Sequence, residues 1–147
     1  MRIAVLNGPN LNLLGTREPA VYGRDTMAEL EARVSARAAE LGVALVWRQT
    51  NHEGTFVEWV QALPGEVEGA LVNAAALTHT SLAVRDAWLA VRVPFVEVHL
   101  SNIFAREPER RRSLLADLAV GVVAGFGPQS YVLGLDALVG HLRGRAA

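Results

Sequence analysis

The stretch Ile3-Ala4-Val5-Leu6-Asn7-Gly8-Pro9 is a short apolar run that ends in a turn. An unbroken apolar run predicts a strand covered on both faces, and Pro9 interrupts it because proline fixes φ and has no amide hydrogen. A helix is predicted from Thr26, because Thr26 and Glu29 have the spacing of a capping box and Gly42 suits a C-terminal cap. The apolar positions of this helix recur at helical spacing: Met27, Leu30, Val34, Ala38 and Leu41.

The same alternation continues along the chain. Further strands are predicted at residues 43–47, 70–72, 95–98 and 118–124. Helices are predicted from Thr55, where Thr55 and Glu58 repeat the capping-box spacing, and over residues 81–91 and 131–142. Strands separated by helical windows are typical of βαβ units and a parallel sheet. We therefore expect an α/β fold: a flavodoxin-like, doubly wound, five-stranded parallel sheet with helices on both faces, in one domain over residues 1–147.

Composition excludes several classes of protein. The chain has 147 residues, of which 51% are hydrophobic and 20% charged, and its formal net charge is −1. It is long enough to bury a core and too apolar to be disordered. No apolar run reaches the ~20 residues of a membrane helix, and near-neutral charge argues against nucleic-acid binding through phosphate contacts. With no signal peptide recognisable at the start, a cytoplasmic location is expected.

Two missing residue types restrict the chemistry further. The absence of Cys excludes thiol nucleophiles and Cys-ligated metals, and because all 14 basic residues are Arg, no lysine can form a Schiff base. The histidines lack the spacing of a metal site, and neither a Gly-x-Gly-x-x-Gly motif nor a P-loop follows the first strand. We therefore expect no metal and no cofactor.

Polar residues gather where a doubly wound sheet binds ligands, beyond the carboxyl ends of its strands. The clusters after the first, third and fourth predicted strands contain Asn7, Asn10, Arg17, Tyr22, Asn73, His79, His99, Ser101 and an arginine-rich run from Arg106 to Arg112. Each cluster alone also fits a turn, a helix cap or a solvated face. Their shared edge of the sheet favours a site, whereas His52 and His141 are expected to be structural or surface residues.

These residue types can perform acid–base chemistry. A guanidinium favours the ionised form of a nearby phenol, so Arg17 and Tyr22 on one loop can supply a base. His99 follows Glu97 by two residues, so on a strand the two side chains share a face, and Glu97 can orient and charge the imidazole as a general acid. Such a base and acid suit proton abstraction beside a carbonyl with loss of water.

Five segments of the chain resemble type II 3-dehydroquinate dehydratase. They are Asn-Gly-Pro-Asn-Leu-Asn-Leu-Leu-Gly at 7–15, Arg-Glu-Pro with Val-Tyr-Gly within 17–23, Thr-His-Thr-Ser at 78–81, Glu-Val-His-Leu-Ser-Asn at 97–102 and Gly-Phe-Gly at 125–127. The resemblance spans residues 3–138. It implies a flavodoxin-like fold, a dodecamer of four trimers, and conversion of 3-dehydroquinate to 3-dehydroshikimate in the shikimate pathway. The implied reaction is an anti elimination through an enolate, without metal or cofactor.

The resemblance also implies individual roles. Tyr22 would take the C2 proton, Arg17 would hold Tyr22 as tyrosinate, and His99 would protonate the departing C1 hydroxyl. Asn10 would help to hold a water molecule that stabilises the enolate oxygen. The residues implied in substrate binding are Asn73, His79, Leu100, Ser101 and Arg110, together with Asp86 from a neighbouring subunit.

Two positions depart from the family pattern. Ala75 stands where glycine is usual, and if that position requires a positive φ, alanine carries a cost of about a kcal/mol or more. Arg111 and Arg112 lie in a stretch that usually contains histidine, so which arginine meets the substrate stays open, with Arg110 in register. The alternative function is that of a catalytically inactive flavodoxin-like homologue that binds a ligand such as flavin or phosphate. Pro9 counts against a phosphate cradle because it removes an amide donor.

Overall fold

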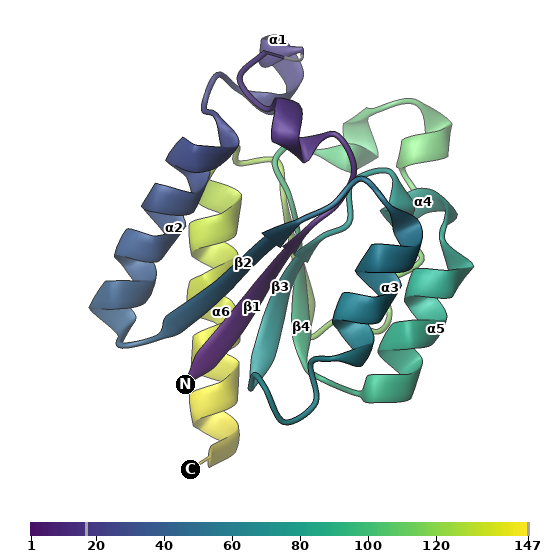
Figure 1. The fold of residues 1–147 in the computed structure, drawn as a ribbon. Helices are drawn as coiled ribbons and strands as arrows, with labels where there is room; N and C mark the ends of the chain where they lie inside the picture. Colours follow the sequence, from purple (N-terminus) through teal and green to yellow (C-terminus); the bar gives the residue numbers. More distant parts are fainter. Residues whose placement is uncertain (17, 147) are drawn as a thin grey trace.

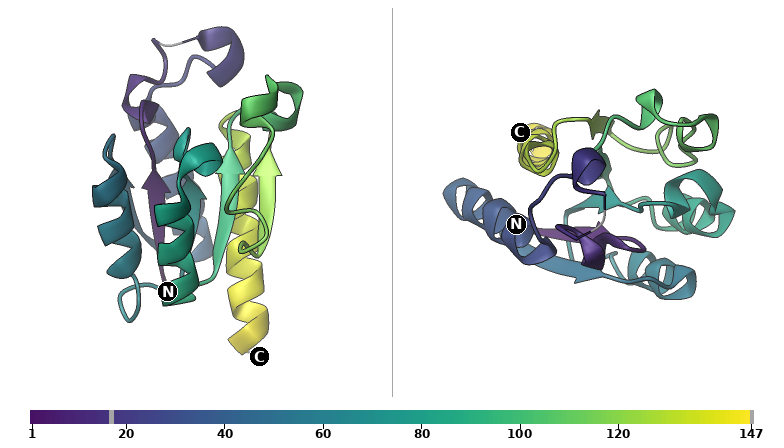
Figure 2. Two further views of the ribbon diagram at one scale, coloured as in Figure 1. Left: turned by 90° about the vertical axis from the view of Figure 1, so that its right-hand side faces the viewer. Right: turned by 90° about the horizontal axis from the view of Figure 1, so that it is seen from above.

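The computed structural model describes residues 1–16 and 18–146, and within this part of the chain five parallel strands form one sheet in the order β2-β1-β3-β4-β5 (Figure 1). The strands are β1 (Arg2–Asn7), β2 (Ala44–Gln49), β3 (Gly69–Asn73), β4 (Phe95–His99) and β5 (Gly121–Ala124). One face of the sheet carries α2 (Met27–Leu41) and α6 (Gln129–Ala146), and the other carries α3 (Glu53–Gln61) and α5 (Leu82–Val91) (Figure 2). The predicted fold class is confirmed.

Short helical turns occupy the edge at which the strands end, shown at the top of Figure 1. They are η1 (Leu11–Leu13), α1 (Pro19–Tyr22), α4 (Leu77–Thr80), η2 (Ile103–Ala105) and η3 (Pro108–Arg110). No helix in the described part of the chain is long and apolar enough to cross a membrane. Irregular connections therefore concentrate at the carboxyl edge of the sheet, where doubly wound folds bind ligands.

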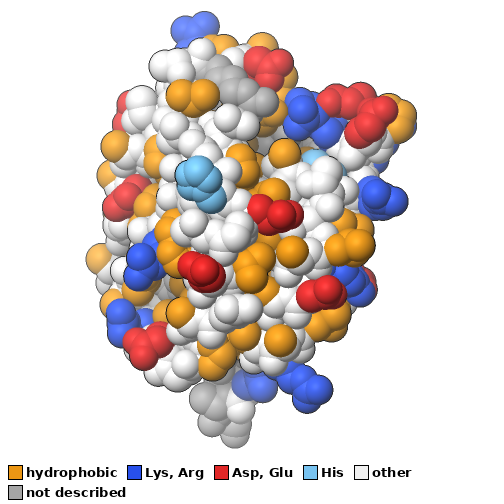
Figure 3. All heavy atoms as spheres, turned by 45° about the vertical axis from the view of Figure 1, so that its right-hand side comes forward, with side chains coloured by type: hydrophobic (Ala, Val, Ile, Leu, Met, Phe, Trp, Pro, Cys, Tyr) orange, Lys and Arg blue, Asp and Glu red, His pale blue; other side chains and the backbone are white. Residues whose placement is uncertain are grey.

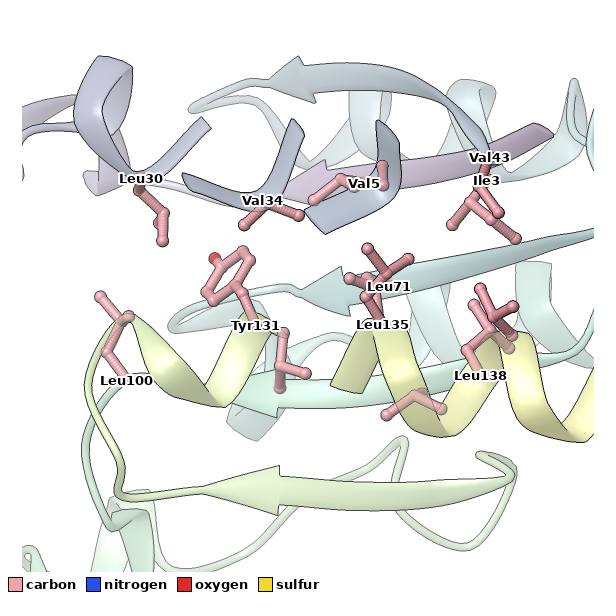
Figure 4. Close-up of a cluster of buried hydrophobic side chains, with 14 of the residues drawn as sticks. Ile3, Val5, Leu30, Val34, Val43, Leu71, Leu100, Tyr131, Leu135 and Leu138 are labelled. Atoms are coloured by element: carbon pink, nitrogen blue, oxygen red, sulfur yellow. The ribbon is translucent and has the colours of Figure 1, made fainter. Parts of the chain in front are cut away.

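Strand alternation divides the core between the two faces of the sheet. Ile3 and Val5 of β1 pack toward α2 and α6, whereas Ala4 and Leu6 pack toward α3 and α5. Figure 4 shows the first of these cores, in which Leu135 and Leu138 of α6 project toward the strands. Each large aliphatic side chain buried in this way contributes about 1.5–3 kcal/mol relative to an exposed one.

The helix signals were right for α2 and wrong for α3. Thr26 Oγ1 accepts a hydrogen bond from the Glu29 amide at 3.2 Å, and Gly42 ends α2 with a φ of 71°. Thr55 and Glu58 do not cap α3, because this helix already begins at Glu53, after His52. The Thr50 hydroxyl accepts a hydrogen bond from the His52 amide at 3.0 Å, and the helix that follows this turn begins three residues earlier than the capping-box spacing predicts.

The last two predicted elements have different bounds in the structure. The fifth strand was expected from residue 118 but covers only Gly121–Ala124, because the amides of Leu118 and Ala119 bond the Leu115 carbonyl in a turn. The last helix is longer than the predicted 131–142 and covers Gln129–Ala146. The apolar pattern therefore located both elements but not their ends, and for β5 the turn before it decides where the strand begins.

A buried polar bridge joins the ends of β1 and β3 to α6. The Tyr131 hydroxyl donates to Asn7 Oδ1 at 2.7 Å and accepts from Asn73 Nδ2 at 2.9 Å. Tyr131 and Asn7 are fully buried, and burial raises the pKa of Tyr131 above its ordinary value, which keeps the phenol neutral. The neutral hydroxyl can therefore donate and accept at once, and it sets the orientation of the Asn73 amide.

Two glycines allow backbone segments to approach closely. A Cβ atom at Gly8 would lie 2.3 Å from the carbonyl oxygen of Ala74, and one at Gly134 would lie 2.6 Å from Val98 Cγ1. Gly8 therefore brings the loop after β1 against the end of β3, and its amide donates to the Asn73 carbonyl at 2.8 Å. Gly134 brings α6 against β4.

We predict that Gly8→Ala lowers the free energy of unfolding by about 1–3 kcal/mol, because the rigid Ala74 backbone must move to admit the methyl group. Urea denaturation measures the change. The matched control is Gly140→Ala in α6, where the added Cβ meets no atom within 4 Å. The control should gain up to about 1 kcal/mol because alanine is the better helix former. Equal stability of the two variants would contradict this account of Gly8.

Candidate active site

A pocket opens at the carboxyl edge of the sheet, beyond the ends of β1, β3 and β4. Of the predicted site residues that the structure describes, eight line it: Asn10, Tyr22, Asn73, His79, His99, Leu100, Ser101 and Arg110. The two remaining predicted residues differ in what the structure says of them. Arg17 lies outside the described residues, and Asp86 lies exposed on α5, away from the pocket lining of its own chain.

His99 lines the pocket, and Glu97 lies buried behind it. Both residues follow the alternation of β4 to the same face, as the two-residue spacing predicts, and His99 Nε2 lies 2.6 Å from Glu97 Oε2. Glu97 is 0% exposed. Burial of a carboxylate requires partners, and the second oxygen, Oε1, accepts a hydrogen bond from Ser113 at 2.7 Å. Glu97 is therefore placed to fix the orientation of the His99 imidazole.

His79 stands beside this pair. Its ring is stacked on the ring of His99, with centroids 6.5 Å apart and planes at 19°. His79 Nδ1 lies 2.7 Å from the carbonyl oxygen of Arg112, which can only accept, so Nδ1 carries the hydrogen. Burial lowers the pKa of His79 below its ordinary value, and the nearby charges of His99 and Arg110 act in the same direction. The neutral ring therefore offers the lone pair of Nε2.

Tyr22 meets a guanidinium that the sequence analysis did not single out. Arg106 Nη1 donates to the Tyr22 hydroxyl at 3.2 Å, and the Arg106 guanidinium carbon lies 5.3 Å from the centre of the Tyr22 ring. Arg106 also donates to Ser101 Oγ at 3.4 Å. In the sequence Arg106 was one member of an arginine-rich run. The available signal was its position, because it is the arginine of that run nearest to the end of β4.

Arg110 reaches the same pocket from η3. Its guanidinium donates a hydrogen bond to the carboxylate of Glu107, three residues earlier. The pKa of Glu107 is lowered below its ordinary value, first by a backbone hydrogen bond within Glu107 and second by this bond from Arg110. Arg106 and Arg110 thus place two cationic groups at the pocket, and among the described residues the other ionisable lining side chains are Tyr22, His79 and His99. This charge suits a substrate that carries a carboxylate.

Asn10 adopts a left-handed backbone, with a φ of 70°. Asparagine tolerates this region better than most residues. The Asn10 amide donates to Asn51 Oδ1 at 2.9 Å, and Gln49 Nε2 donates to the same oxygen at 3.1 Å. Gln49 and Asn51, at and just beyond the end of β2, therefore hold the backbone of Asn10 in place at the pocket.

Ala75 also has a positive φ, of 54°. This position therefore requires the left-handed conformation that glycine adopts most easily, and alanine adopts it here. Its amide donates to Asn73 Oδ1 at 3.1 Å. Together with the Tyr131 bond, this contact leaves Asn73 with both ends of its amide oriented by the protein. Alanine at this position therefore carries the steric cost of a left-handed backbone.

The fold and the pocket together define a class of protein: an α/β enzyme whose site has a phenol beside a guanidinium and an imidazole backed by a buried carboxylate. Among the described residues, no group of three His, Asp or Glu side chains is placed to hold a metal ion. The groups present can remove one proton and deliver another.

Comparison with known proteins agrees with this class. The family model for class II dehydroquinase matches residues 1–139. The chain is 60% identical over 136 residues to a 3-dehydroquinate dehydratase of Azorhizobium caulinodans, covering 92% of each chain. It is 57% identical over 144 residues to that of Synechococcus sp. strain WH7803, covering 98% of each. The crystal structure of a type II dehydroquinase from Propionibacterium acnes superposes with a TM-score of 0.90 at 39% identity, covering 95% of this chain and 96% of the other.

The chain belongs to the class II dehydroquinase family. As a member of this family it is a hydro-lyase, an enzyme that removes water from its substrate. The resemblance recognised in the sequence motifs is thereby confirmed.

We predict opposite effects of glycine at two adjacent positions of the pocket loop. Ala75→Gly should raise the free energy of unfolding by up to about 1 kcal/mol, because glycine adopts a positive φ without steric cost. Ala76→Gly should lower it by about 0.5–1 kcal/mol, because Ala76 has a φ of −62° and glycine there only adds freedom to the unfolded chain. Thermal or urea unfolding measures both. A loss of stability in Ala75→Gly would contradict the strain at Ala75.

Proposed function

We propose that the protein dehydrates 3-dehydroquinate to 3-dehydroshikimate by anti elimination through an enolate. The observation that carries this proposal is that one pocket is lined by both the Tyr22–Arg106 pair and His99, which Glu97 backs. The relatives in the family are 3-dehydroquinate dehydratases, which supports the same reaction. A cytoplasmic enzyme of the shikimate pathway fits this activity.

In the first step, the Tyr22 phenolate takes the proton from C2 of the substrate. The C–H electron pair moves into the C2–C3 bond, and the C3 carbonyl becomes an enolate oxygen. The Arg106 guanidinium, 3.2 Å from the Tyr22 hydroxyl, stabilises the phenolate that starts the step. Arg17, on the loop of Tyr22, is proposed as a further cation for the phenolate. Asn10 is proposed to hold a water molecule that donates to the enolate oxygen.

In the second step, the enolate re-forms the C3 carbonyl, the electron pair of the C2–C3 double bond moves into a new C1–C2 double bond, and the bond between C1 and its hydroxyl oxygen breaks. His99 gives that oxygen a proton, so that water leaves. Because Nε2 of His99 is engaged by Glu97, the proton comes from Nδ1. Tyr22 ends the cycle protonated and His99 ends it neutral, and exchange with solvent restores both.

The remaining pocket residues are proposed to bind and orient the substrate. The main-chain amides of Leu100 and Ser101, the Ser101 hydroxyl and the Arg110 guanidinium suit the substrate carboxylate. Asn73 and His79 are proposed to bind its hydroxyl groups, with Nε2 of His79 as an acceptor. A substrate held at both its carboxylate and its hydroxyl groups keeps C2 close to Tyr22 and the C1 hydroxyl close to His99. This orientation of the reacting groups contributes to the rate.

We further propose that the working unit is a homo-oligomer, a dodecamer of four trimers, in which Asp86 joins the site of a neighbouring subunit. Leu82, Asp86 and Leu89 recur at helical spacing on one exposed face of α5, where the two leucines are 63% and 49% exposed. Figure 3 shows hydrophobic side chains exposed among charged side chains of both signs on the surface it presents. A second copy packed on α5 would cover these leucines and bring Asp86 close to polar groups of that second copy.

The assay follows the absorbance of the enone formed from 3-dehydroquinate. We predict that the wild-type protein forms it and that Tyr22→Phe lowers turnover by about 10²–10⁴-fold, because only the ionisable oxygen is lost. Unfolding curves should be unchanged. Near-normal turnover of this variant would remove Tyr22 from the role of base. A wild-type chain that forms no enone but alters the spectrum of added flavin would favour the inactive ligand-binding alternative.

Subunit mixing tests the shared site. Asp86→Ala and Tyr22→Phe subunits, each weakly active alone, should regain activity when refolded together, because some sites then combine an intact Tyr22 with an intact Asp86 from a neighbour. The control is Glu58→Ala, an exposed acidic residue on α3, which should be as active as wild type. Full activity of Asp86→Ala alone, or of a monomeric wild type, would contradict the proposal.

A further inference from the structure

The hydroxyl of Ser113 lies directly behind the Glu97–His99 pair. Ser113 Oγ is 2.7 Å from Glu97 Oε1, and it also accepts hydrogen bonds from the amides of Leu115 at 3.1 Å and Ala116 at 3.0 Å. A serine hydroxyl has one hydrogen and two lone pairs. Because the two amides use the lone pairs, the single hydrogen is committed to Glu97.

This commitment fixes the carboxylate of Glu97 at both oxygens. Oε1 receives the Ser113 hydroxyl and Oε2 receives His99 Nε2 at 2.6 Å. Glu97 is 0% exposed, so if either hydrogen-bond partner of its carboxylate were removed, solvent water would not replace it. With both oxygens engaged, the carboxylate holds the hydrogen of His99 on Nε2 and leaves Nδ1 as the nitrogen that meets a ligand.

The residue before Ser113 holds the second histidine. The Arg112 carbonyl accepts from His79 Nδ1 at 2.7 Å, so His79 presents Nε2 instead. The two stacked rings therefore show opposite nitrogens to the pocket, one as proton donor and the other as acceptor. The Arg112 carbonyl and the Ser113 hydroxyl, from consecutive residues, thus set the orientations of the His79 ring and, through Glu97, of the His99 ring.

We propose that Ser113 is a positioning residue for the elimination, because it holds Glu97 so that His99 delivers its proton from Nδ1. The inference rests on the proposed function of His99 as the acid. Ser113 does not line the pocket, so it acts through Glu97 and not on the substrate.

Three substitutions separate this role from the simpler one of capping the turn at Leu115 and Ala116. Ser113→Thr keeps both the hydrogen and the acceptor. Ser113→Asp keeps the acceptor, since aspartate caps as well as serine, but replaces the hydrogen with a negative charge facing Glu97. Ser113→Ala loses both functions. A merely structural role predicts that the aspartate variant works, whereas positioning of Glu97 predicts that it fails.

The measurement is kcat and KM for enone formation. We expect Ser113→Thr within about threefold of wild type, and kcat of Ser113→Asp and Ser113→Ala lower by about 10–100-fold with little change in KM, as for other partners that orient a functional histidine. The matched control is Ser130→Ala, which removes another buried hydroxyl that accepts a backbone amide, from Phe126 at 2.9 Å, outside the site; it should keep wild-type kcat. A fully active Ser113→Asp overturns the proposal.

Coupling to Glu97 provides a second test. In the Glu97→Gln background, adding Ser113→Ala should cost less than about twofold in kcat, because the group through which Ser113 acts is already altered. Independent, multiplicative losses would overturn the proposal.

A spectroscopic readout makes the test independent of turnover. The hydrogen on His99 Nε2 should give a slowly exchanging imidazole resonance in the proton NMR spectrum of wild type and Ser113→Thr, and lose it in Ser113→Asp. If wild type forms no enone but shows this pattern, the proposed function fails and the positioning by Ser113 stands. A resonance unaffected by Ser113→Asp overturns the positioning itself.

Discussion

The hydroxyl group of Tyr131 bonds two asparagines at the ends of neighbouring strands, and the geometry of the pocket depends on that contact. One asparagine, Asn7, ends β1 just before the loop that carries Asn10, and the other, Asn73, lines the pocket itself. Leaving either amide unpaired in the core would cost about 1–3 kcal/mol, so the bridge admits essentially one arrangement of the strand ends. A helix from the end of the chain thereby aligns residues from its beginning and middle.

The fold could be predicted from the sequence because strand and helix periods are local. β1 has buried residues on both faces, and this is already visible as an unbroken apolar run. Helix starts were less predictable, because Thr26–Glu29 and Thr55–Glu58 have the same spacing but only the first caps a helix. The difference lies in the Thr50 hydroxyl, which bonds the His52 amide and starts α3 earlier. Spacing alone does not contain that contact.

The site was predictable to the extent that it follows strand ends. Asn73 and His99 end β3 and β4, so their meeting follows from parallel strands in one sheet. The pairing of Tyr22 with Arg106 depends on the paths of two loops, and the sequence offered Arg17 as a nearer partner. The part played by Ser113 was also hidden, because it lies 16 residues from Glu97 and its contact forms only when the segment after η3 folds back on β4.

Gly134 has a consequence that reaches from the back of the sheet to the pocket. It sits one turn after Tyr131 on the same side of α6, at the place where a Cβ atom would lie 2.6 Å from Val98. Because Gly134 has no side chain, α6 can pack closer to β4 than any other residue at this position would allow. Because Tyr131 is carried on the same rigid rod, that spacing also sets the reach of its hydroxyl toward Asn73. The orientation of Asn73 at the pocket therefore depends partly on the absence of a side chain at Gly134, a residue that does not itself line the pocket.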